Sequence, residues 1–386
     1  EVEQLGLIMR ALCPKVVSER PFYPRYGPKR VAEKGIFGIV QKSNSFFFDS
    51  KIDRAFFRSH FVNYGMSEEL GYSVERIIPD PSTWYDASKV SRRISRLRFV
   101  PKDITKARSI CAEPNVYMFF QQGVAAQLVS GFETTCARRF IDLKDQSRNR
   151  NLALYGSYTG EIDTIDLSSA SDSVSIELVR RIFPRDVLYF LLATRTSKVE
   201  LADNTVVEVK KFAPMGSALC FPVQCLVFSA VVILAAIQRA RGVAVGESVE
   251  TDSHWFDDIS DTVDCLFSRQ PIVNVRESVR VNPAAVYGDD ICVDSSLTPY
   301  VTHLLVSLGF EVNTSKSFTS SQAFRESCGG YYYNGEDVTP LYFRVNSILS
   351  SEMTAECVTS VIACANNAGD QCLRNLRRHM VHTLLW

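Results

Sequence analysis

The alternation of apolar and polar residues over positions 285–293 predicts a β-hairpin. Two apolar half-strands flank a polar tip that contains Gly288, Asp289 and Asp290. Glycine takes the positive φ that a tight two-residue turn requires, so Gly288 marks the turn. A second strand is predicted over residues 161–167, where alternate side chains fall on opposite faces and Asp166 stands near the end. The pattern therefore places acidic residues at the ends of two strands.

The longest uncharged stretch, residues 215–237, predicts a helix that is apolar on all sides. Its length is sufficient to span a bilayer. Gly216, Ser217, Pro222 and Gln224 interrupt the first half, however, and the apolar remainder is short. We expect a buried core helix and no membrane partner, with a transmembrane helix as the alternative.

Weaker patterns complete the secondary structure. Residues 198–211 alternate as a hairpin with its turn at 202–204, and residues 241–280 are acidic and irregular, which indicates a surface insertion. Further helices are predicted over residues 116–129, 174–182, 299–308 and 352–386.

Composition narrows the class of protein without identifying a partner. The 386 residues are 46% hydrophobic, which suffices for a sizeable core with two or three subdomains. With 43 basic and 43 acidic residues the net charge is zero, so a nucleic-acid partner has to show as local clustering. The eleven cysteines include no C-x-x-C pair, which indicates reduced, buried thiols and no zinc site. Because the sequence begins at Glu1 and ends at Trp386, we expect a fragment of a longer protein.

Residues 89–108 form a basic block with a single acid, Asp103. Its eight cations are Lys89, Arg92, Arg93, Arg96, Arg98, Lys102, Lys106 and Arg108. Such a local positive field suits phosphate groups, because each contact releases condensed counterions. A basic, solvent-facing helix is the alternative, although Pro101 would end it and leave residues 102–108 extended.

Asp166, Asp289 and Asp290 are the main candidates for chemistry. Adjacent carboxylates are costly unless a cation neutralises them, and Mg²⁺ prefers oxygen ligands that it shares with substrate phosphates. Solvated turn residues are the alternative for all three, and a helix N-cap is the alternative for Asp172. A strand ending in Asp, a glycine turn into a buried helix, and a hairpin tipped by two Asp follow the order of a nucleic-acid polymerase palm.

Several ordered motifs resemble those of the levivirus (Qβ-type) RNA phage replicases. In chain order they are the basic fingers motif, motifs A, B, C and D, and the stretch that follows. The matching residues are Phe99-Val100-Pro101-Lys102 through Glu113-Pro114, Asp166-Leu167-Ser168-Ser169-Ala170-Ser171-Asp172-Ser173, Met215-Gly216-Ser217, Tyr287-Gly288-Asp289-Asp290, Asn313-Thr314-Ser315-Lys316 and Phe324-Arg325-Glu326-Ser327-Cys328-Gly329. The insertion at 241–280 is longer than the family leads us to expect, and little follows residue 345.

The resemblance implies an α+β right-hand polymerase fold, with an antiparallel-sheet palm, fingers and a truncated thumb. The N-terminal region and fingers would span residues 1–160, and the palm residues 161–345. The palm would include finger segments at about 184–214 and the surface insertion at about 241–280. Residues 346–386 would begin an incomplete thumb.

The resemblance also implies roles for single residues. Asp166, Asp289 and Asp290 would hold two Mg²⁺ ions, which Mn²⁺ could replace. The substrate-binding residues would be Lys102, Lys106 and Arg108 at the triphosphate, and Asp172, Gly216 and Ser217 beside the template and sugar. Lys316 would act as general acid for the departing pyrophosphate, with a plain surface lysine as the alternative.

The predicted function is that of an RNA-directed RNA polymerase, which transfers nucleotides from ribonucleoside triphosphates to an RNA 3′-hydroxyl. It would replicate a phage RNA genome in the cytoplasm of a bacterial host, with RNA template and product as partners. The resemblance adds host translation elongation factors and a ribosomal protein. A reverse transcriptase-like polymerase and an inactive RNA-binding scaffold are the alternatives. Small residues after the first Asp, Ser168 to Ala170, favour ribonucleotides, and a scaffold needs no placed carboxylates.

Overall fold

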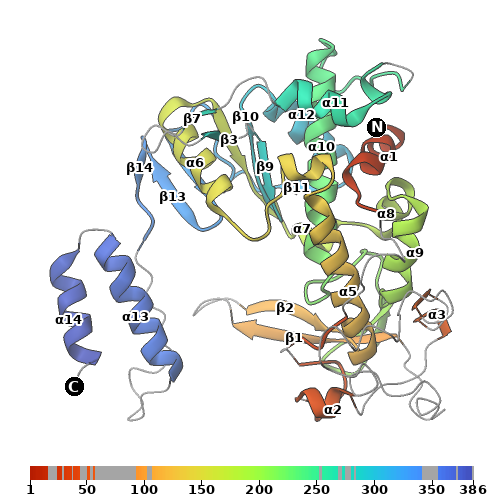
Figure 1. Cartoon of the computed structure of the whole chain (residues 1–386), viewed down its shortest axis with the longest axis vertical. Coiled ribbons are helices and arrows are strands. Elements are labelled where there is room, and N and C mark those ends of the chain that lie inside the picture. Colours follow the sequence, from red (N-terminus) through yellow and green to blue (C-terminus); the bar gives the residue numbers. More distant parts are fainter. Residues whose placement is uncertain are drawn as a thin grey trace.

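The computed structural model describes residues 1–15, 24–27, 30–36, 38–43, 50–52, 55–56, 93–101, 107–251, 254–267, 272–273, 280–281, 284–340, 355–370 and 373–384. Within these ranges, helices surround small sheets whose strands pair antiparallel (Figure 1). One parallel contact occurs, between β1 (Ile94–Pro101) and β5 (Lys198–Glu200). The predicted α+β class is confirmed.

The core is organised around α10 (Cys220–Ala240), which is the long apolar helix expected from the sequence. Every residue from Pro222 to Gln238 is buried, and Pro222 is tolerated because it stands in the first turn. By length and composition α10 could cross a membrane, but 89% of its most apolar window is buried inside the protein. The prediction of a buried core helix is confirmed.

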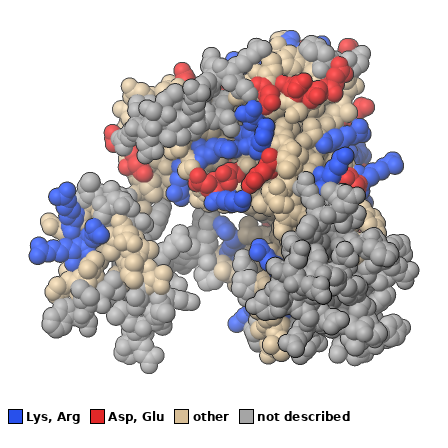
Figure 2. Space-filling model, in the orientation of Figure 1, with Lys and Arg blue, Asp and Glu red and all other residues tan. Residues whose placement is uncertain are grey.

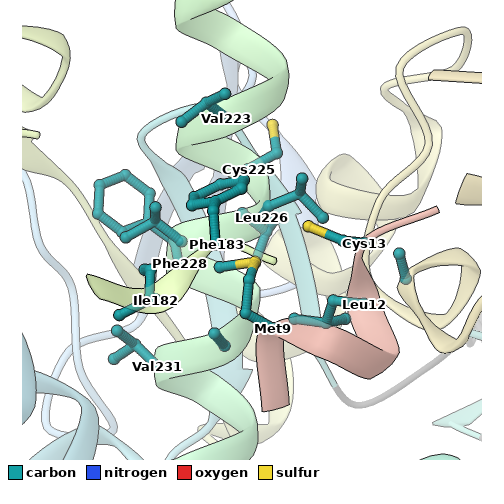
Figure 3. Packing of buried hydrophobic residues seen from close by; sticks show 14 of the residues in the cluster. Met9, Leu12, Cys13, Ile182, Phe183, Val223, Cys225, Leu226, Phe228 and Val231 are labelled. Carbon is teal, nitrogen blue, oxygen red and sulfur yellow. The ribbon is translucent and has the colours of Figure 1, made fainter. Parts of the chain in front are cut away.

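Two helices that are far apart in the sequence pack against α10. They are α1 (Val2–Leu12) and α12 (Thr298–Ser307), and α1 also packs on α8 (Ile176–Ile182). Figure 3 shows Met9 of α1 close to Leu226 of α10. These contacts bury apolar side chains from segments far apart in the sequence, which fixes α10 behind the sheet described next.

The central sheet has the strand order β3–β10–β9 and is antiparallel throughout. Its bounds are Ile162–Ile165 for β3, Ala284–Tyr287 for β9 and Asp290–Asp294 for β10. Asp290 pairs with Tyr287, so Gly288 and Asp289 form a two-residue turn, and Gly288 has a φ of +67°. The predicted hairpin is confirmed. The chain of β3 continues into β4 (Leu167–Ser168), which pairs with β11 (Glu311–Val312).

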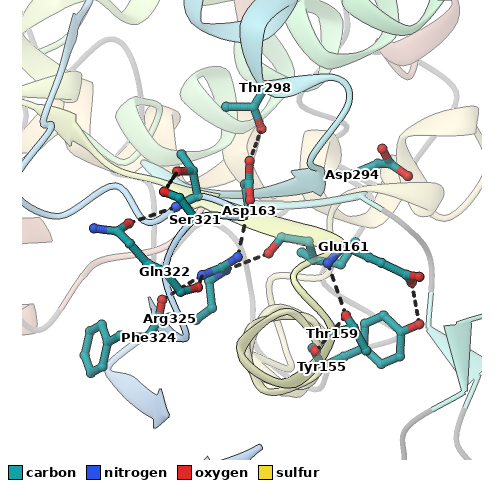
Figure 4. Close-up of polar contacts among 12 residues, drawn as sticks. Tyr155, Thr159, Glu161, Asp163, Asp294, Thr298, Ser321, Gln322, Phe324 and Arg325 are labelled. Atoms are coloured by element: carbon teal, nitrogen blue, oxygen red, sulfur yellow. Dashed lines mark hydrogen bonds and ion pairs between the residues drawn. The ribbon is translucent and has the colours of Figure 1, made fainter. Parts of the chain in front are cut away.

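A second sheet, β12–β13–β14, lies next to the central one with helix α6 packed against it. The bounds are Ser147–Thr159 for α6, Phe324–Ser327 for β12, Gly330–Tyr333 for β13 and Glu336–Asp337 for β14. A fully buried Arg325 ties β12 to β3: its Nε donates to the carbonyl of Ile162 at 2.6 Å, and Nη2 lies 3.4 Å from Asp163 Oδ1 (Figure 4). Thr298 donates to the other oxygen of Asp163 at 2.7 Å.

The third large sheet has the order β2–β1–β5–β6 and holds the described part of the basic block. Here β2 spans Ala107–Ala112 and β6 spans Val206–Glu208, which confirms the predicted hairpin at 198–211. Helix α5 (Asn115–Phe132) follows β2 and packs on α9 (Arg185–Thr194). The predicted helix over 116–129 is thereby confirmed.

The expected irregular surface insertion at 241–280 is irregular and mostly exposed over residues 241–251, but its next described part is not irregular. Helix α11 (Ile259–Phe267) follows a short 3-10 turn, His254–Phe256, and buries Ile259, Val263 and Phe267 in the main core. The ring of Phe267 meets Phe140 edge-on at 4.8 Å. Two of the acids of this stretch, Asp261 and Asp264, occupy the other face of this amphipathic helix. Two short paired strands follow, β7 (Ile272–Val273) and β8 (Arg280–Val281).

The remaining elements are short or terminal. They are α2 (Ile39–Ser43), α3 (Ser50–Ile52), the 3-10 helix Cys136–Arg139, α7 (Ala170–Ser173), α13 (Ala355–Asp370) and α14 (Arg374–Leu384). The last two pack against each other near the C-terminal end, as the predicted helical tail requires (Figure 1).

Candidate active site

Three acidic residues meet where β3 ends and the β9–β10 hairpin turns. Because Ile291 pairs with Ile165, Asp290 and Asp166 occupy the next position along the same antiparallel ladder. Asp289 lies in the turn beside them, and its charge raises the pKa of both neighbours. The structure thus brings together the three carboxylates that the sequence singled out.

Asp166 is half-buried and held by the loop that follows β11. The side-chain amide of Asn313 donates to Asp166 Oδ2 at 2.8 Å, and the backbone amide of Asp166 donates to the hydroxyl of Ser317 at 3.0 Å. Burial raises the pKa of Asp166, the hydrogen bond from Asn313 and the charge of Lys316 lower it, and neighbouring carboxylates raise it. The Asp166 carboxylate is therefore partly removed from solvent and lies close to the other acidic side chains, Asp289 and Glu326.

Asp290 is held by the β12–β13 turn. Its Oδ1 accepts from the backbone amide of Cys328 at 3.1 Å and from the hydroxyl of Ser327 at 3.4 Å. Burial, first, and the charges of Asp289, Asp166 and Glu326 together raise the pKa of Asp290 to about 6, against the lowering effect of the hydrogen bond from the Cys328 amide. A nearby positive charge would restore the ionised form.

A small pocket joins these groups. Its lining consists of Thr164, Ile165, Asp166, Asp290, Ile291, Lys316, Glu326 and Ser327. Figure 2 shows acidic and basic side chains gathered on the face over the ends of the central strands. Lys316 is exposed at the edge of this pocket.

Sequence reasoning missed Glu326 and Asn313 as members of the site, although both lie in stretches that carry family motifs. The available signal was the alternation along β12, where Arg325 faces inward and Glu326 therefore faces the other way. Nothing local in the sequence links Asn313 to Asp166, because that contact joins residues far apart in the chain.

The donor set fits a hard divalent cation in chemistry. The charges of Asp289 and Glu326 raise the pKa of both Asp166 and Asp290. Such mutual repulsion is expected where acids gather without a cation to neutralise them. In the described parts of the chain, however, no three His, Cys, Asp or Glu side chains come close enough together to hold a metal ion by themselves. Mg²⁺ commonly relies on one or two carboxylates and completes its shell with water and substrate phosphate.

The loop at residues 215–217 is fixed against β2. The backbone amide of Cys111 donates to the carbonyl of Met215 at 2.7 Å. Gly216 has a φ of +117°, and a Cβ there would lie 2.2 Å from the carbonyl oxygen of Cys111. Ser217 donates from its hydroxyl to Gln121 Oε1 at 3.0 Å. Only glycine fits at position 216, and hydrogen bonds hold the residues on either side of it, Met215 and Ser217.

Asp172 is not the helix N-cap that the sequence left as an alternative. It lies inside the short helix α7, whose N-cap position is occupied by Ser169 in a left-handed conformation, φ +51°. The carboxylate of Asp172 forms an ion pair with Lys211. The next helix, α8, is capped by Ser175, which accepts from the amide of Leu178 at 3.0 Å.

The basic block divides into structural and exposed cations. Arg93 donates to the carbonyls of Arg195 and Ala193, and Arg96 pairs with Glu200 at 3.1 Å directly across β1 and β5. Arg108 is exposed on β2, where a phosphate could reach it. The extended conformation expected from residue 102 onward is confirmed for the part in β2, and Lys102 and Lys106 lie outside the described residues.

Comparison with known proteins identifies relatives over most of the chain. The family model for the RNA replicase beta-chain matches residues 75–247 and 270–354. The chain is 34% identical over 245 residues to the RNA-directed RNA polymerase subunit beta of Escherichia virus Qbeta, an alignment that covers 64% of this chain and 34% of the relative. It is 32% identical, also over 245 residues, to the RNA-directed RNA polymerase beta chain of Escherichia phage MS2, which covers 64% of this chain and 37% of the relative.

The chain therefore spans about a third of the length of the curated relatives it matches. Among solved structures, the RNA-dependent RNA polymerase of a human picobirnavirus aligns with a TM-score of 0.41 at 12% identity, over 75% of this chain and 55% of that one. The gap in the family match, 248–269, contains α11, so this helix is an insertion relative to the family even though it packs into the core.

Proposed function

Because this chain belongs to the RNA replicase beta-chain family, we propose that it carries the catalytic palm of an RNA-directed RNA polymerase. The observation that carries the proposal is the pairing of β3 with β10, which sets Asp166 beside Asp290 with Asp289 in the adjoining turn. Carboxylates on two neighbouring strands are held at fixed positions, as binding of divalent cations requires. Acidic residues that merely occupy solvated turns would not need to be aligned by strand pairing.

We assign the metal-binding role to Asp166, Asp289 and Asp290, with Glu326 adding negative charge at the pocket. When bound there, two Mg²⁺ ions, or Mn²⁺ in their place, would activate a 3′-hydroxyl and stabilise the leaving pyrophosphate. Asn313 orients Asp166 through its 2.8 Å hydrogen bond, and the amide of Cys328 orients Asp290. Lys316 would give a proton to the pyrophosphate as its charge develops.

Substrate contacts follow from the surrounding elements. Lys102, Lys106 and Arg108 would meet the triphosphate, and Gly216 and Ser217 would lie beside the template and the ribose. Asp172 would contact the 2′-hydroxyl through an oxygen that its ion pair with Lys211 leaves free. The proposed substrates are ribonucleoside triphosphates and an RNA template, and the setting is the cytoplasm of a bacterial host. Host elongation factors and a ribosomal protein are proposed as partners on family grounds alone.

A reverse transcriptase and an inactive RNA-binding scaffold are the competing functions. The direct test is addition of a single labelled nucleotide to a short primed RNA, with Mg²⁺ or Mn²⁺ and either sugar. Ribonucleotide addition supports the proposal, preferential deoxyribonucleotide addition supports the reverse transcriptase, and RNA binding with no addition supports the scaffold.

The Asp289→Asn variant makes this test specific to the site. Loss of one electrostatic element of a catalytic site typically costs about 10²–10³ in rate, so addition should fall by that factor while RNA binding is retained. Asp257→Asn is the matched control, because it removes an exposed carboxylate outside the pocket. Near-normal turnover in Asp289→Asn would remove the polymerase assignment.

A further inference from the structure

A buried carboxylate, Glu113, stands behind the 215–218 loop and has no part in the chemistry proposed above. It follows β2 directly and is 1% exposed. Its Oε1 accepts from the hydroxyl of Thr196 at 3.0 Å. Its Oε2 is buried and, among the described residues, accepts no hydrogen bond of normal geometry. Burying a carboxylate with one oxygen that accepts no hydrogen bond lowers the stability of the folded protein, so its presence here suggests a functional role.

The side chain between Glu113 and the loop is Gln121 of α5, also 1% exposed. Its Oε1 accepts from the hydroxyl of Ser217 at 3.0 Å and from the backbone amide of Ala218 at 3.2 Å. Its Nε2 donates to the carbonyl of Thr194 at 2.9 Å. Glu113, Gln121 and Ser217 line one small cavity, so the three side chains belong to a single buried polar group.

Among the residues that the structure describes, none forms an ion pair with Glu113. Arg195, the nearby cation, donates instead to the carbonyls of Phe212, Val209 and Lys211. Burial raises the pKa of Glu113 to about 7, while Thr196, the amide of Gln121 and the charge of Arg195 lower it. Gln121 therefore presents its NH₂ group toward the carboxylate, because its carbonyl oxygen there would be repelled.

That orientation has a consequence for the loop. A side-chain amide has one donor end and one acceptor end, and the hydrogen-bond partners decide which way it points. With NH₂ toward Glu113 and Thr194, the acceptor Oε1 is left facing Ser217 and Ala218, which both donate to it. If the amide rotated by half a turn, its NH₂ group would face the backbone amide of Ala218, which can only donate, and that tether would be lost. The hydroxyl of Ser217, which already accepts from the amide of Leu219, would have to turn from donor to acceptor to keep its contact.

We propose that Glu113 is a positioning residue, which fixes the amide of Gln121 and thereby holds Ser217 and the 215–218 loop in place beside the nucleotide sugar. The inference rests on the proposed function for its catalytic consequence, but the loop geometry stands without it. β2 would then serve the site twice, since it carries Arg108 at one end and clamps Met215 and Gly216 through Cys111 at the other.

The test is Glu113→Gln, which keeps the size of the side chain but can donate to Oε1 of Gln121 and compete with the loop. Amide hydrogen exchange of the 215–219 segment should become roughly tenfold faster, the scale of one hydrogen bond. In single-nucleotide addition, KM for the ribonucleotide should rise and the ratio of kcat/KM for ribose over deoxyribose should fall by a similar factor, with kcat little changed.

Two further variants separate positioning from general softening. Exchanging the two residues, Glu113→Gln with Gln121→Glu, restores a donor facing an acceptor, although the carboxylate at position 121 cannot donate to the carbonyl of Thr194, and it should recover part of the slow exchange and of the sugar ratio. Val263→Ala creates a small cavity under α11, away from β2 and from this group, and should leave both unchanged. If Glu113→Gln does not fold, Gln121→Met should show the same faster exchange.

Unchanged loop exchange in Glu113→Gln, no recovery in the exchanged pair, or the same loss in Val263→Ala would each overturn the inference. A wild-type chain that adds no nucleotide would refute the proposed function instead, and the exchange measurements would still decide the role of Glu113.

Discussion

At the scale of single residues, burial sets the charge state of the acids that surround the site. Asp290 and Glu113 have pKa values raised to about 6 and about 7, each chiefly by burial, but their settings differ. Asp290 lies at the pocket beside Asp166, whose pKa is also raised, as the proposed cation site requires. Glu113 lies among amides and hydroxyls with the charge of Arg195 nearby, as the proposed positioning role requires. Under these two proposals a similar shift accompanies binding in one case and positioning in the other.

Stability should fall as pH rises through the range in which Glu113 ionises. Its folded pKa of about 7 lies above the ordinary glutamate value of 4.5, so the folded state prefers the protonated acid. The cost is absent below about pH 4.5 and complete above about pH 7. Glu113→Gln removes this titration, and its free energy of unfolding relative to wild type should improve by up to about 3 kcal/mol between these limits.

The measurement is urea denaturation of both proteins at several pH values. Val199→Ala serves as control, because it removes no titrating group and its difference from wild type should stay level. Parallel curves for Glu113→Gln and wild type would show that the carboxylate ionises without cost. A variant that is more stable at pH 8 yet holds its loop less firmly would be a trade-off between stability and function.

At the scale of elements, the parts predicted from sequence are those whose information is local. The β9–β10 hairpin was predictable because alternation and Gly288 specify both strands and the turn. Helix α11 was missed because its acids hid an i, i+4, i+8 apolar stripe, Ile259, Val263 and Phe267, that packs into the core. The contacts of Asn313 and Glu326 with the site depend on which strands lie next to each other in the folded protein. No local sequence pattern predicts that arrangement.

The close approach between the 215–217 loop and β2 predicts that Gly216→Ala is far more damaging than Gly242→Ala. The new Cβ would lie 2.2 Å from a backbone oxygen of Cys111, so the loop or β2 has to move. Gly242→Ala is the matched control, because its φ is also positive, +67°, but nothing lies within 4 Å. The control should cost about 1–2 kcal/mol from backbone strain alone.

Gly216→Ala should exceed that cost and should also reduce nucleotide addition, whereas Gly242→Ala should leave addition intact. Chemical denaturation and single-nucleotide addition measure the two effects. Equal losses of stability in the two variants would show that the loop can move away from Cys111 freely.

The buried pair of Arg325 and Asp163 is expected to hold β12 against β3 (Figure 4). Arg325→Met leaves Asp163 buried without its cation and the carbonyl of Ile162 without its donor. Removing one partner of a buried pair costs about 3–5 kcal/mol, which denaturation would detect. Arg181→Met is the control, since its pair with Glu177 is exposed and such pairs contribute about 0.3–0.5 kcal/mol. A loss in Arg325→Met no larger than in the control would contradict the role given to this arginine.

At the scale of the whole molecule, zero net charge means that attraction to RNA has to come from where the cations lie. Arg93 and Arg96 are engaged within the protein, so the basic block offers fewer cations to RNA than its sequence suggests. Arg108 is exposed at the start of β2, on the strand whose other end clamps the 215–217 loop. Within the described part of the basic block, the exposed charge on which the proposed RNA binding would depend is therefore confined to the β1–β2 pair, at Arg98 and Arg108.

This confinement predicts how RNA binding responds to salt. Replacing Lys102, Lys106 and Arg108 with alanine should weaken binding and flatten the log–log dependence of affinity on salt by roughly one unit for each phosphate that the protein no longer binds. Removing three charges at the exposed Arg185, Arg239 and Arg241 is the control, and it should leave the slope nearly unchanged because these residues lie on α9 and at the far end of α10. Titrations of a short RNA at several salt concentrations give both slopes. Equal flattening in the two triple variants would mean that RNA responds to the total charge of the protein, and the basic block would then be a solvated face with no track for phosphates.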